Sequence, residues 1–455
     1  KHLVQELNIY EDMLSNTISG TVVIGDSLNL IANLPIQGTE RLSFKLATPG
    51  AHRPEHIIDC TDESGHPMHV YKLSDKQQAK EGMQTYILHY CSREVLRSTR
   101  TRVSQAYSGR IDQMVADIFT DENYLDSKKT LNVQKTRNQD KIVVPNLSPF
   151  HAIQMLCNRA LADSATDMSA GYYFYETTKG FHFRSWESMC VDGRGNPRKV
   201  KQIFRYMPAN IKDPSITNKM EHDYTAVQSY EFVNNFHDVL ANTVLGTYGH
   251  RVITHNLYDK SYKETDYHYH NNFADTHHTD GPNPAIVNTP VDYDDKSVSD
   301  YPESRVSVMP TTRFAHNEDS GAFGIDVEQD GIITATRVSQ NNAVTSGTNL
   351  KLQVKGQSYL EPGDVIKFNI LSVENKQNSE GALDPQFAGR YIISKIRHRV
   401  SGGEYIQVLE CVKDSVFKPY RSDGDKSYKA KQLPKEKGEA TDIFSFNDTR
   451  ARHHY

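Results

Sequence analysis

The sequence predicts a mainly β protein with an α+β insertion and two small antiparallel β-domains that arose by internal duplication. Three observations carry this prediction. The first is a meander of alternating apolar strands near the C-terminus, and the second is a looser copy of it near the N-terminus. The third is that the segment between them has arginine-rich and helical sequence patterns in place of strand alternation. A chain of 455 residues is also too long for a single hydrophobic core, so about two to four domains are expected.

The C-terminal meander spans Gln357 to Asp414. Pro362-Gly363 favours a turn, because proline presets one backbone angle and glycine accepts a positive φ. The runs that follow alternate apolar and polar residues, and Gly402-Gly403 turns the chain between the last two. Such alternation is typical of antiparallel strands with one buried face.

The N-terminal copy has the same landmarks at nearly the same spacing. Gly38…Phe44 corresponds to Gly363…Phe368, and Tyr86…Cys91 corresponds to Tyr405…Cys411. Each spacing differs by one residue, so two unrelated meanders remain the alternative to an internal duplication.

Residues 1–95 form the first predicted β-domain. Gly20, inside the second strand, is a candidate bulge, and a short helix-like segment ends at Pro35. Strands are expected near residues 3–10, 18–24, 42–46, 56–60, 69–73 and 85–91.

Residues 96–200 are predicted to be the α+β insertion. A helix is expected from Ile111, whose apolar residues recur at helical spacing, with Ser108 or Asp112 as its cap. Ser148-Pro149 has the cap-then-proline pattern of a second helix start. A hairpin turning at Thr178-Lys179-Gly180 follows.

Residues 201–240 plus 321–416 are predicted to form the second β-domain. The meander needs further strands, which Leu350–Val354 and the segment 202–234 are expected to supply, with a helix near 330–343 across them. Residues 241–320 are expected to hold an inserted strand and a long polar loop, because loops of that length are uncommon inside one domain. The polar tail, 417–455, is predicted to be an arm that orders on a partner.

Composition excludes several classes of protein. The net charge of −5 is not that of a polycation that coats nucleic acid. The five cysteines are far apart and include no C-x-x-C pair, which favours a reducing compartment. No stretch approaches the roughly 20 apolar residues of a membrane span, so no membrane insertion is expected. The usual nucleotide-binding, hydrolase, zinc-protease and calcium motifs are absent from the sequence.

A histidine-rich stretch is the only candidate metal site. His268 and His270 share a strand face in this interpretation, and His277 and His278 follow closely. Two histidines at i, i+2 with a carboxylate can bind zinc or iron. The alternative, which the absence of a recurrent ligand spacing favours, is a polar loop whose histidines never converge, with no metal and no cofactor.

Two groups of cations are candidate partner interfaces. Arg97, Arg100 and Arg102 belong to an arginine-rich run that suits phosphate or an acidic partner, or else a solvated face with ordinary ion pairs. Lys395, Arg397 and Arg399 alternate on the outward face of the last meander, where a partner surface, a channel wall or a solvated sheet face gives the same pattern.

Three stretches resemble the baseplate hub protein of large contractile-tailed phages, with the copies of marine and cyanobacterial phages closest. They are ELNIYEDMLSNTISGTVVIGDSLNLIANLPIQGTERLSFKL, YEFVNNFHDVLANTVLGTYGHRVITHNLYDK and FAGRYIISKIRHRV. The resemblance extends over most of 1–416 and weakens in the 270–320 loop and in the tail. The valine-glycine-repeat spike proteins of type VI secretion are similar in their N-terminal half.

The resemblance implies a structural virion protein. It implies a homotrimer with two tube-type antiparallel β-barrel domains per chain, which form a pseudo-sixfold ring around the channel for DNA ejection. That ring joins the hexameric tail tube to the trimeric cell-puncturing spike, among other baseplate (wedge) proteins, in a tail assembled in the host cytoplasm. Hubs of this type are not enzymes, so no catalytic residue is expected, and the genomic DNA passes without specific binding.

Two rivals remain at this point. One is a metal-dependent hydrolase that uses the His268–His278 loop; the other is the hub of a type VI or tailocin contractile device, which shares the fold. A channel that must not grip DNA is expected to have a mildly acidic or mixed wall. For this reason the cations Lys395, Arg397 and Arg399 are expected at a subunit or tube contact.

Overall fold

The computed structural model describes residues 3–34, 36–48, 56–137, 139–163, 169–206, 223–234, 238–256, 260, 262–291, 294–311, 327–372 and 383–418. The chain is mainly β with antiparallel sheets, as the sequence predicts. Within these ranges, no helix has the length and apolar character needed to cross a membrane.

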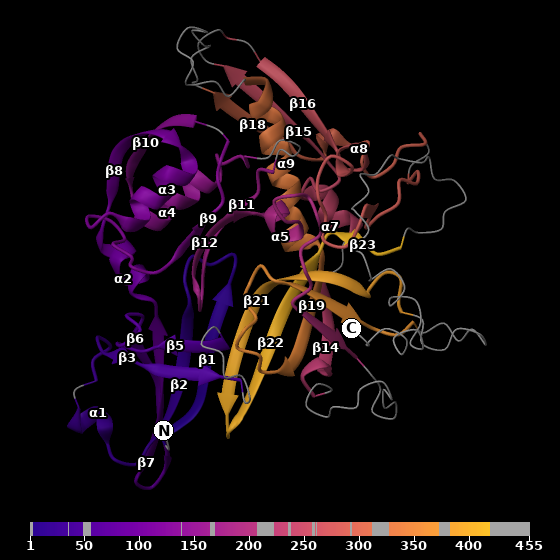
Figure 1. Cartoon of the computed structure of the whole chain (residues 1–455). Helices are drawn as coiled ribbons and strands as arrows, with labels where there is room; N and C mark the ends of the chain where they lie inside the picture. Colours follow the sequence, from indigo (N-terminus) through magenta and orange to yellow (C-terminus); the bar gives the residue numbers. More distant parts are fainter. Residues whose placement is uncertain are drawn as a thin grey trace.

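One 11-stranded sheet organises the molecule. Its main path runs β14-β19-β22-β21-β1-β2-β7-β6-β3, and β20 and β13 branch from β21. Strands of both predicted β-domains therefore lie in one sheet, which occupies the lower half of Figure 1. The strands are β1 (Val4–Asp12), β2 (Ser19–Asp26), β3 (Arg41–Leu42), β6 (Met68–Lys80), β7 (Met83–Cys91), β13 (Gln202–Arg205), β14 (Val227–Asn234), β19 (Thr348–Lys355), β20 (Val365–Asn369), β21 (Gly389–Ser401) and β22 (Glu404–Lys413).

The sheet contains the same four-stranded unit twice. In the first repeat the strand order is β6-β7-β2-β1, and in the second it is β21-β22-β19-β14. The members also follow the same chain order, β1, β2, β6, β7 against β14, β19, β21, β22. The sequence landmarks Tyr86…Cys91 and Tyr405…Cys411 lie on equivalent strands, β7 and β22. Topology therefore supports the duplication independently of sequence.

A shared β-bulge fixes the correspondence to single residues. β6 has a bulge between Val70 and Lys72, opposite Tyr90 and His89. β21 has one between Ile393 and Lys395, opposite Cys411 and Glu410. Because one extra residue stands at the same place in each hairpin, Lys72 corresponds to Lys395 and Tyr90 to Cys411. The sequence match of Cys91 with Cys411 was therefore wrong by one residue.

Gly20 is not at a bulge, as the sequence suggested, but at a close approach. Its neighbours pair in register with β1 and β7. A Cβ atom there would stand 2.2 Å from the Tyr90 ring and 2.3 Å from the Asn8 carbonyl oxygen. Glycine is needed because the tyrosine ring lies across this strand, where its hydroxyl donates to the same carbonyl.

The rest of the first repeat closes its core around Tyr86 and Tyr90, both fully buried. β4 (Phe44–Ala47) and β5 (Ile57–Cys60) form a separate hairpin against this core, and α1 (Leu30–Asn33) is a single turn.

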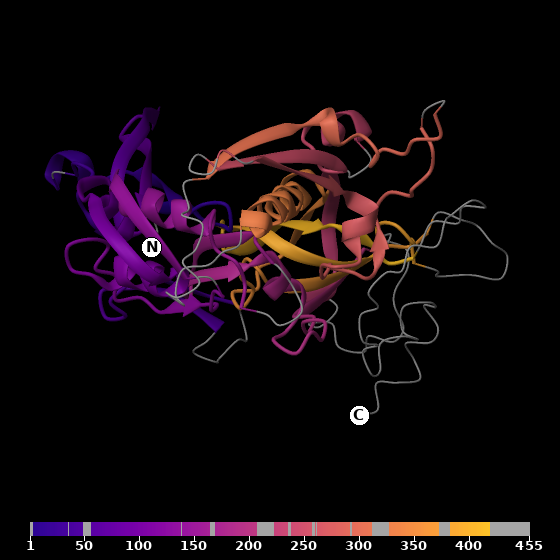
Figure 2. The ribbon, with the colours of Figure 1, turned by 90° about the horizontal axis from the view of Figure 1, so that it is seen from above.

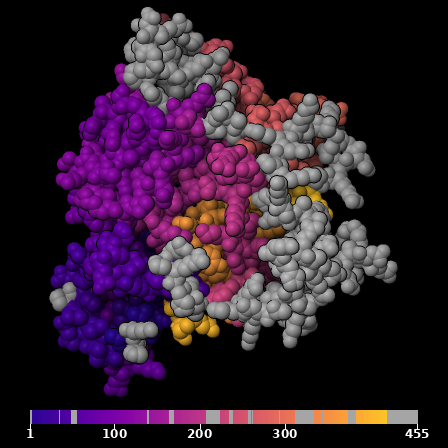
Figure 3. Space-filling view, viewed as in Figure 1, coloured from indigo at the N-terminus to yellow at the C-terminus, as the bar shows by residue number. Residues whose placement is uncertain are grey.

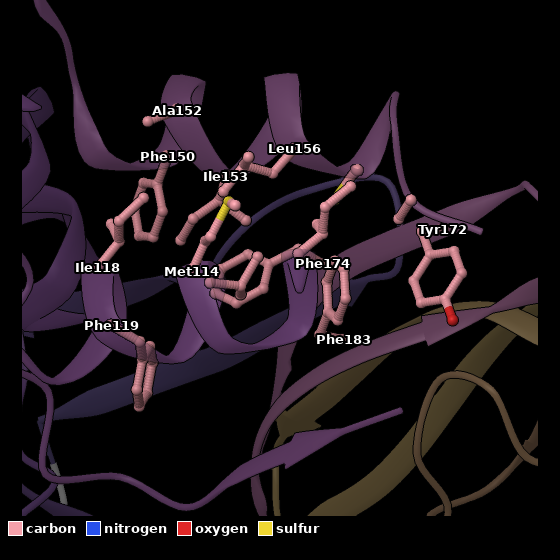
Figure 4. Close-up of a cluster of buried hydrophobic side chains, with 14 of the residues drawn as sticks. Met114, Ile118, Phe119, Phe150, Ala152, Ile153, Leu156, Tyr172, Phe174 and Phe183 are labelled. Atoms are coloured by element: carbon pink, nitrogen blue, oxygen red, sulfur yellow. The ribbon is translucent and has the colours of Figure 1, made fainter. Parts of the chain in front are cut away.

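An α+β segment with its own core lies above the first repeat in Figure 1. Figure 4 shows this core, where helices α3 and α4 pack Met114, Ile118, Ile153 and Leu156 against the aromatic hairpin β11–β12. The elements are α2 (Arg93–Arg100), β8 (Val103–Arg110), α3 (Ile111–Thr120), β9 (Leu131–Val133), β10 (Gln139–Leu147), α4 (Pro149–Cys157), β11 (Tyr172–Thr177), β12 (Gly180–Ser185) and α5 (Trp186–Cys190).

The two helix starts differ in how well the sequence predicted them. α4 begins at Pro149 with Ser148 as N-cap, as predicted. The cap of α3 is Arg110 and not Ser108 or Asp112. Asp112 lies inside the first turn, where the Arg110 guanidinium and the Thr136 hydroxyl donate to its carboxylate.

A third segment is inserted between β14 and β19. Figure 2 shows its long helix α9 between a three-stranded sheet, β16-β15-β18, and the strands of the second repeat. Its elements are α7 (Val239–Val244), β15 (Gly249–Asn256), β16 (Tyr262–His268), α8 (Tyr269–Phe273), β17 (Asn283–Pro284), η2 (Pro302–Ser304), β18 (Val306–Thr311) and α9 (Val327–Ser346); β17 pairs with β23 (Ser415–Val416).

The described part of the predicted polar loop is built into the fold. Ala285 and Val298 join a buried cluster with Tyr269, and the buried Ser299 bonds His270. Apolar content misled the prediction because hydrogen-bonded polar side chains fill this interior. The predicted arm, 417–455, lies outside the described residues except for Phe417 and Lys418.

Candidate assembly interface

The two repeats join through β1 and β21. These strands pair antiparallel from Glu6↔Ser401 to Asp12↔Lys395. The last strand of the first repeat is thus hydrogen-bonded to the first strand of the second, a head-to-tail contact within one chain.

The predicted interface cations lie on this junction. Lys395 is 3.4 Å from the Asp12 carboxylate and 3.7 Å from that of Glu410. Arg397 donates to Asn8 at 3.0 Å, and both Arg397 and Arg399 pair with Glu6. Their side chains remain between 41% and 46% exposed. The partners of these cations are therefore side chains of the chain's own β1 and, for Lys395, also Glu410 of β22.

The electrostatics of the junction favour the ionised acid. Partial burial opposes ionisation of Glu6, but hydrogen bonds from Asn8 and Arg399 and the charges of Arg399 and Arg397 outweigh it. Together they hold the pKa of Glu6 below its usual value.

The same junction also has a buried pair of a carboxylate and a histidine ring. The Glu11 carboxylate and the His398 ring are both fully buried, and Glu11 Oε1 lies 2.7 Å from His398 Nε2. The other ring nitrogen is 2.7 Å from the Tyr405 hydroxyl, and the second Glu11 oxygen accepts from the Thr178 amide. This network connects β1, β21, β22 and the β11–β12 turn, so it fixes how the two repeats meet.

The exposed face of the second repeat and of the adjoining β1 has a ladder of alternating charge. Asp12, Lys395, Glu410, Lys351 and Glu231 are register neighbours on five successive strands. Opposite charges directly across a sheet stabilise it modestly and cancel one another's field. The other face is buried in the cores around Leu352 and Leu88, so only the charged face is open to a partner or a channel.

Among the described residues, the main path of the sheet ends in two strands with few backbone partners on their outer sides. One is β14, beside which the bridge Arg205↔Ala226 lies just before the strand begins. At the other end β3 covers only the first two residues of β6. Among the described residues, no strand pairs with the outer side of β6 beyond His69. Figure 1 shows β6 and β14 on opposite sides of the sheet.

The arginines of the predicted cluster mostly donate hydrogen bonds to nearby backbone carbonyls. Arg97 donates to the carbonyls of Tyr124 and Glu122, and Arg100 donates to Leu96. Arg102 donates to the carbonyls of Thr99 and Thr101. Helix α2, which the sequence analysis did not predict, presents Arg93 and Arg100 to a groove of about 700 Å³ that β3 and β6 line on its other side.

The four histidines of the predicted metal site do not converge. His268 ends β16, lies 3.0 Å from Asp300 and caps α8, so it shares no strand with His270. His270 is buried between Ser299 and the Ile286 carbonyl. His278 stacks on Phe273 and pairs with Asp414, and His277 lies beside it at the edge of a small cavity. Within the described ranges no three ligand-type side chains are grouped as a metal site requires.

Sequence reasoning missed three buried ionic clusters that connect the segments. Lys129 lies between Glu94 and Glu176 at 3.0 and 2.5 Å, under the first repeat. Asp414 pairs with His278, and Lys413 with Asp280, where the third segment meets β22. A charged pair ending an apolar strand, such as Lys413-Asp414, was the available signal.

One curated protein is similar to this chain over most of its length. No family model matches the chain. The chain is 18% identical over 416 residues, 90% of each chain, to the probable baseplate hub protein of Vibrio phage KVP40.

Three solved structures are similar to this chain at low sequence identity. One is a tail protein of Neisseria meningitidis (9% identity, TM-score 0.49, 91% of this chain and 93% of that one). Another is the 43 kDa tail protein of prophage MuSo2 from Shewanella oneidensis (8%, TM-score 0.46, 91% and 95%). A third is the E. coli c3393 protein, a component of the type VI secretion system (11%, TM-score 0.42, 92% and 76%).

Proposed function

We propose that this chain is a structural baseplate hub of a contractile-tailed phage. Three copies form a ring that joins the hexameric tail tube to the trimeric cell-puncturing spike. The similarity to a baseplate hub protein over 90% of the chain supports the class of protein. The repeated sheet supports the ring.

The observation that carries the proposal is the head-to-tail junction of two equivalent repeats. Such a contact uses two different surfaces, β1 and β21, and each repeat has both. The chain's free ends, β14 and β6, are the equivalents of those two surfaces. Head-to-tail contacts close into rings, and three chains of two repeats give six units in threefold symmetry. This geometry matches a sixfold tube above to a threefold spike below.

The charged face of the sheet would then line the channel, because the opposite face is buried in the cores. Its charges alternate in sign from Asp12 to Glu231. A wall with balanced charge gives DNA no row of uncompensated cations to bind, so the genome passes without being held. This revises the expectation for Lys395, Arg397 and Arg399: their acid partners make a position on the channel wall acceptable.

The remaining partners and the location follow from the same role. The third segment and the polar sequence beyond Lys418 would contact other baseplate (wedge) proteins. The hub would be assembled in the host cytoplasm and remain in the baseplate of the virion. We assign it no catalytic residues and no cofactor.

The test is the mass of the purified chain in solution, by light scattering at several concentrations, alone and with the spike protein of the same phage. A trimer, or a monomer that becomes a trimer when spike is added, is expected. A monomer or dimer that spike leaves unchanged would refute the hub.

A further inference from the structure

We infer that the side chains of Lys413 and Asp280 condense to an amide, which is a covalent isopeptide cross-link within the chain. The bond ties the third segment, which contains Asp280, to β22 of the second repeat. It is a modification of the folded chain itself and does not depend on the proposed ring. In the proposed hub it would keep the third segment attached to the sheet under mechanical load.

The structure holds the two reacting groups in contact in a dry place. Lys413 Nζ lies 3.5 Å from Asp280 Oδ2, and each side chain is 1% exposed. Among the described residues, Oδ2 has no hydrogen-bond partner. β21 packs directly on this oxygen, since a Cβ atom added at Gly389 would stand 2.0 Å from it. The amine and the carboxyl are therefore close to the separation of about 3 to 3.5 Å at which bound groups react.

The surrounding contacts orient both groups. The backbone amide of Arg390 donates to Asp280 Oδ1 at 2.9 Å. This donor would stabilise the negative charge that Oδ1 gains when the carboxyl carbon is attacked. Lys413 Nζ donates to the Ala388 carbonyl at 2.9 Å and lies 4.9 Å from the centre of the Tyr391 ring. The amine is thus held beside the carboxyl by the same strand that supplies the amide donor.

Burial favours the uncharged forms that the reaction needs. It lowers the pKa of Lys413, and the charges of Asp280 and Asp384 offset this only in part. It raises the pKa of Asp280, although the charges of Lys413 and Arg390 oppose the change. Transfer of one proton from Nζ to the carboxylate therefore gives a neutral amine beside a neutral acid.

The step itself is a condensation. Nζ of Lys413 forms a bond to Cγ of Asp280, and the bond from Cγ to the acid hydroxyl breaks. The hydroxyl leaves as water with one proton from the amine, so no oxidant and no second reactant are needed. Groups fixed in a reactive geometry behave as though at an effective concentration of about 10⁵ to 10⁸ M, which favours the amide.

A second buried lysine shows that a short distance is not sufficient. Lys129 lies closer to its carboxylates, 3.0 Å from Glu94 and 2.5 Å from Glu176. Burial opposes the charge of Lys129, but the two carboxylates outweigh burial and raise its pKa. Lys129 therefore stays an ammonium ion without a lone pair for attack, and it should form no amide.

Cyanogen bromide cleavage of the denatured full chain tests the bond. Met309 is the only methionine between Asp280 and Lys413, so cleavage separates fragments 221–309 and 310–455 unless a bond joins them. Fragment 221–309 contains no cysteine, so a disulfide cannot join the two. We expect the fragments to migrate as one band on a denaturing gel. The uncleaved chain should be lighter than its sequence by the mass of one water.

Two variants and a mapping step complete the test. Lys413→Arg should release the two fragments and restore the sequence mass. Lys129→Arg is the matched control and should leave both readouts as in the unsubstituted chain. Tandem mass spectrometry of the joined band should place the linkage at residues 280 and 413, and a linkage at any other pair would overturn the inference.

The remaining outcomes separate this inference from its rivals. Asp280 precedes Gly281, and such a pair can also lose water by closing a succinimide ring on its own backbone. That product would lower the mass but leave the fragments separate, which would contradict the cross-link. Separate fragments at the full sequence mass would also overturn it, whatever the oligomeric state. Joined fragments in a chain that never trimerises would keep the cross-link and overturn the hub alone.

Discussion

The two repeats of this sheet have the same strand order and the same bulge but fill their cores in opposite ways. In the first, Gly20 faces Tyr90 across paired strands; in the second, the equivalent Leu350 faces Cys411. The first repeat thus packs a small residue against a large one, and the second packs a larger residue against a small one. The layer of buried side chains therefore keeps its thickness. Strand order and one bulge are what both repeats retain, whereas β6 has two further bulges, between Ser74 and Gln77 and between Gln78 and Lys80, that β21 lacks.

The repeats also differ in what interrupts them. β1 passes to β2 through a short turn, whereas a whole segment with its own core separates β14 from β19. In the space-filling view (Figure 3) the tip of the second repeat, in yellow, emerges at the lower edge beside the indigo first repeat. The insertions lie away from this tip, which suggests that the shared sheet forms the ring and the insertions meet other proteins.

Loss of the buried pair at the internal junction should have the largest effect on stability. Glu11→Ala leaves the His398 ring buried without its carboxylate and the Thr178 amide without its acceptor. The free energy of unfolding should fall by about 3 kcal/mol, measured by urea denaturation. Glu404→Ala, an exposed glutamate, is the control and should change it by less than about 0.5 kcal/mol. A loss below about 1 kcal/mol for Glu11→Ala would mean that other contacts hold the repeats together.

The exchanged core pair can be swapped as a test of equivalence. Gly20→Leu drives a side chain into the Tyr90 ring and the Asn8 carbonyl and should cost about 2 to 3 kcal/mol. Gly20→Leu with Tyr90→Cys recreates the pair of the second repeat and should recover part of the loss. Gly193→Ala, where an added Cβ meets nothing within 4 Å, is the matched glycine control. No recovery in the double variant, by thermal unfolding, would break the correspondence between the repeats.

Acid should weaken the second repeat through Asp414. Burial opposes its ionisation, but the charge and hydrogen bond of His278 and the Thr279 amide hold its pKa at about 2, below the ordinary 3.8. A depressed pKa stabilises the fold above about pH 4, and that stabilisation is lost as the pH falls from about 4 to about 2. The loss is on the order of 2 kcal/mol.

The pH dependence of urea unfolding gives the measurement. Asp414→Asn should flatten it between about pH 2 and 4. The residue of the first repeat that is equivalent to Asp414 is Arg93. Because Arg93 has no carboxyl group, the first repeat has no counterpart of this titration. An unchanged slope in Asp414→Asn would place the acid sensitivity elsewhere.

The exposed ion pairs should contribute least. Arg397→Ala with Arg399→Ala removes the partners of Glu6, which are more than two-fifths exposed. Unfolding free energy should fall by less than about 1 kcal/mol, and added salt should reduce the difference. A larger loss that salt does not change would show that these arginines support the junction by packing.

Local pattern in the sequence predicted most of the elements. Alternation located the strands, including Leu350–Val354 and those in 202–234 that complete the second repeat. The helix near 330–343 is part of α9. The β11–β12 hairpin turns at the predicted residues.

What sequence did not predict is adjacency. A period of two assigns a face to Lys395, Arg397 and Arg399 but does not say which strand lies beside them, so their partners Glu6 and Asp12 were missed. The His268-His270 pair was placed on one strand because alternation does not mark the residue at which a strand passes into a helix. The domain boundaries and interface residues chosen from the sequence remain predictions.

The most direct test of the central claim is an image of the assembled particle by electron microscopy. Averaged views of the chain, with spike protein added if it is monomeric alone, should show a closed threefold ring with six similar β units around an open channel. A particle without a central opening, or one in which the two repeats of a chain do not stand as neighbours in a single ring, would contradict the account.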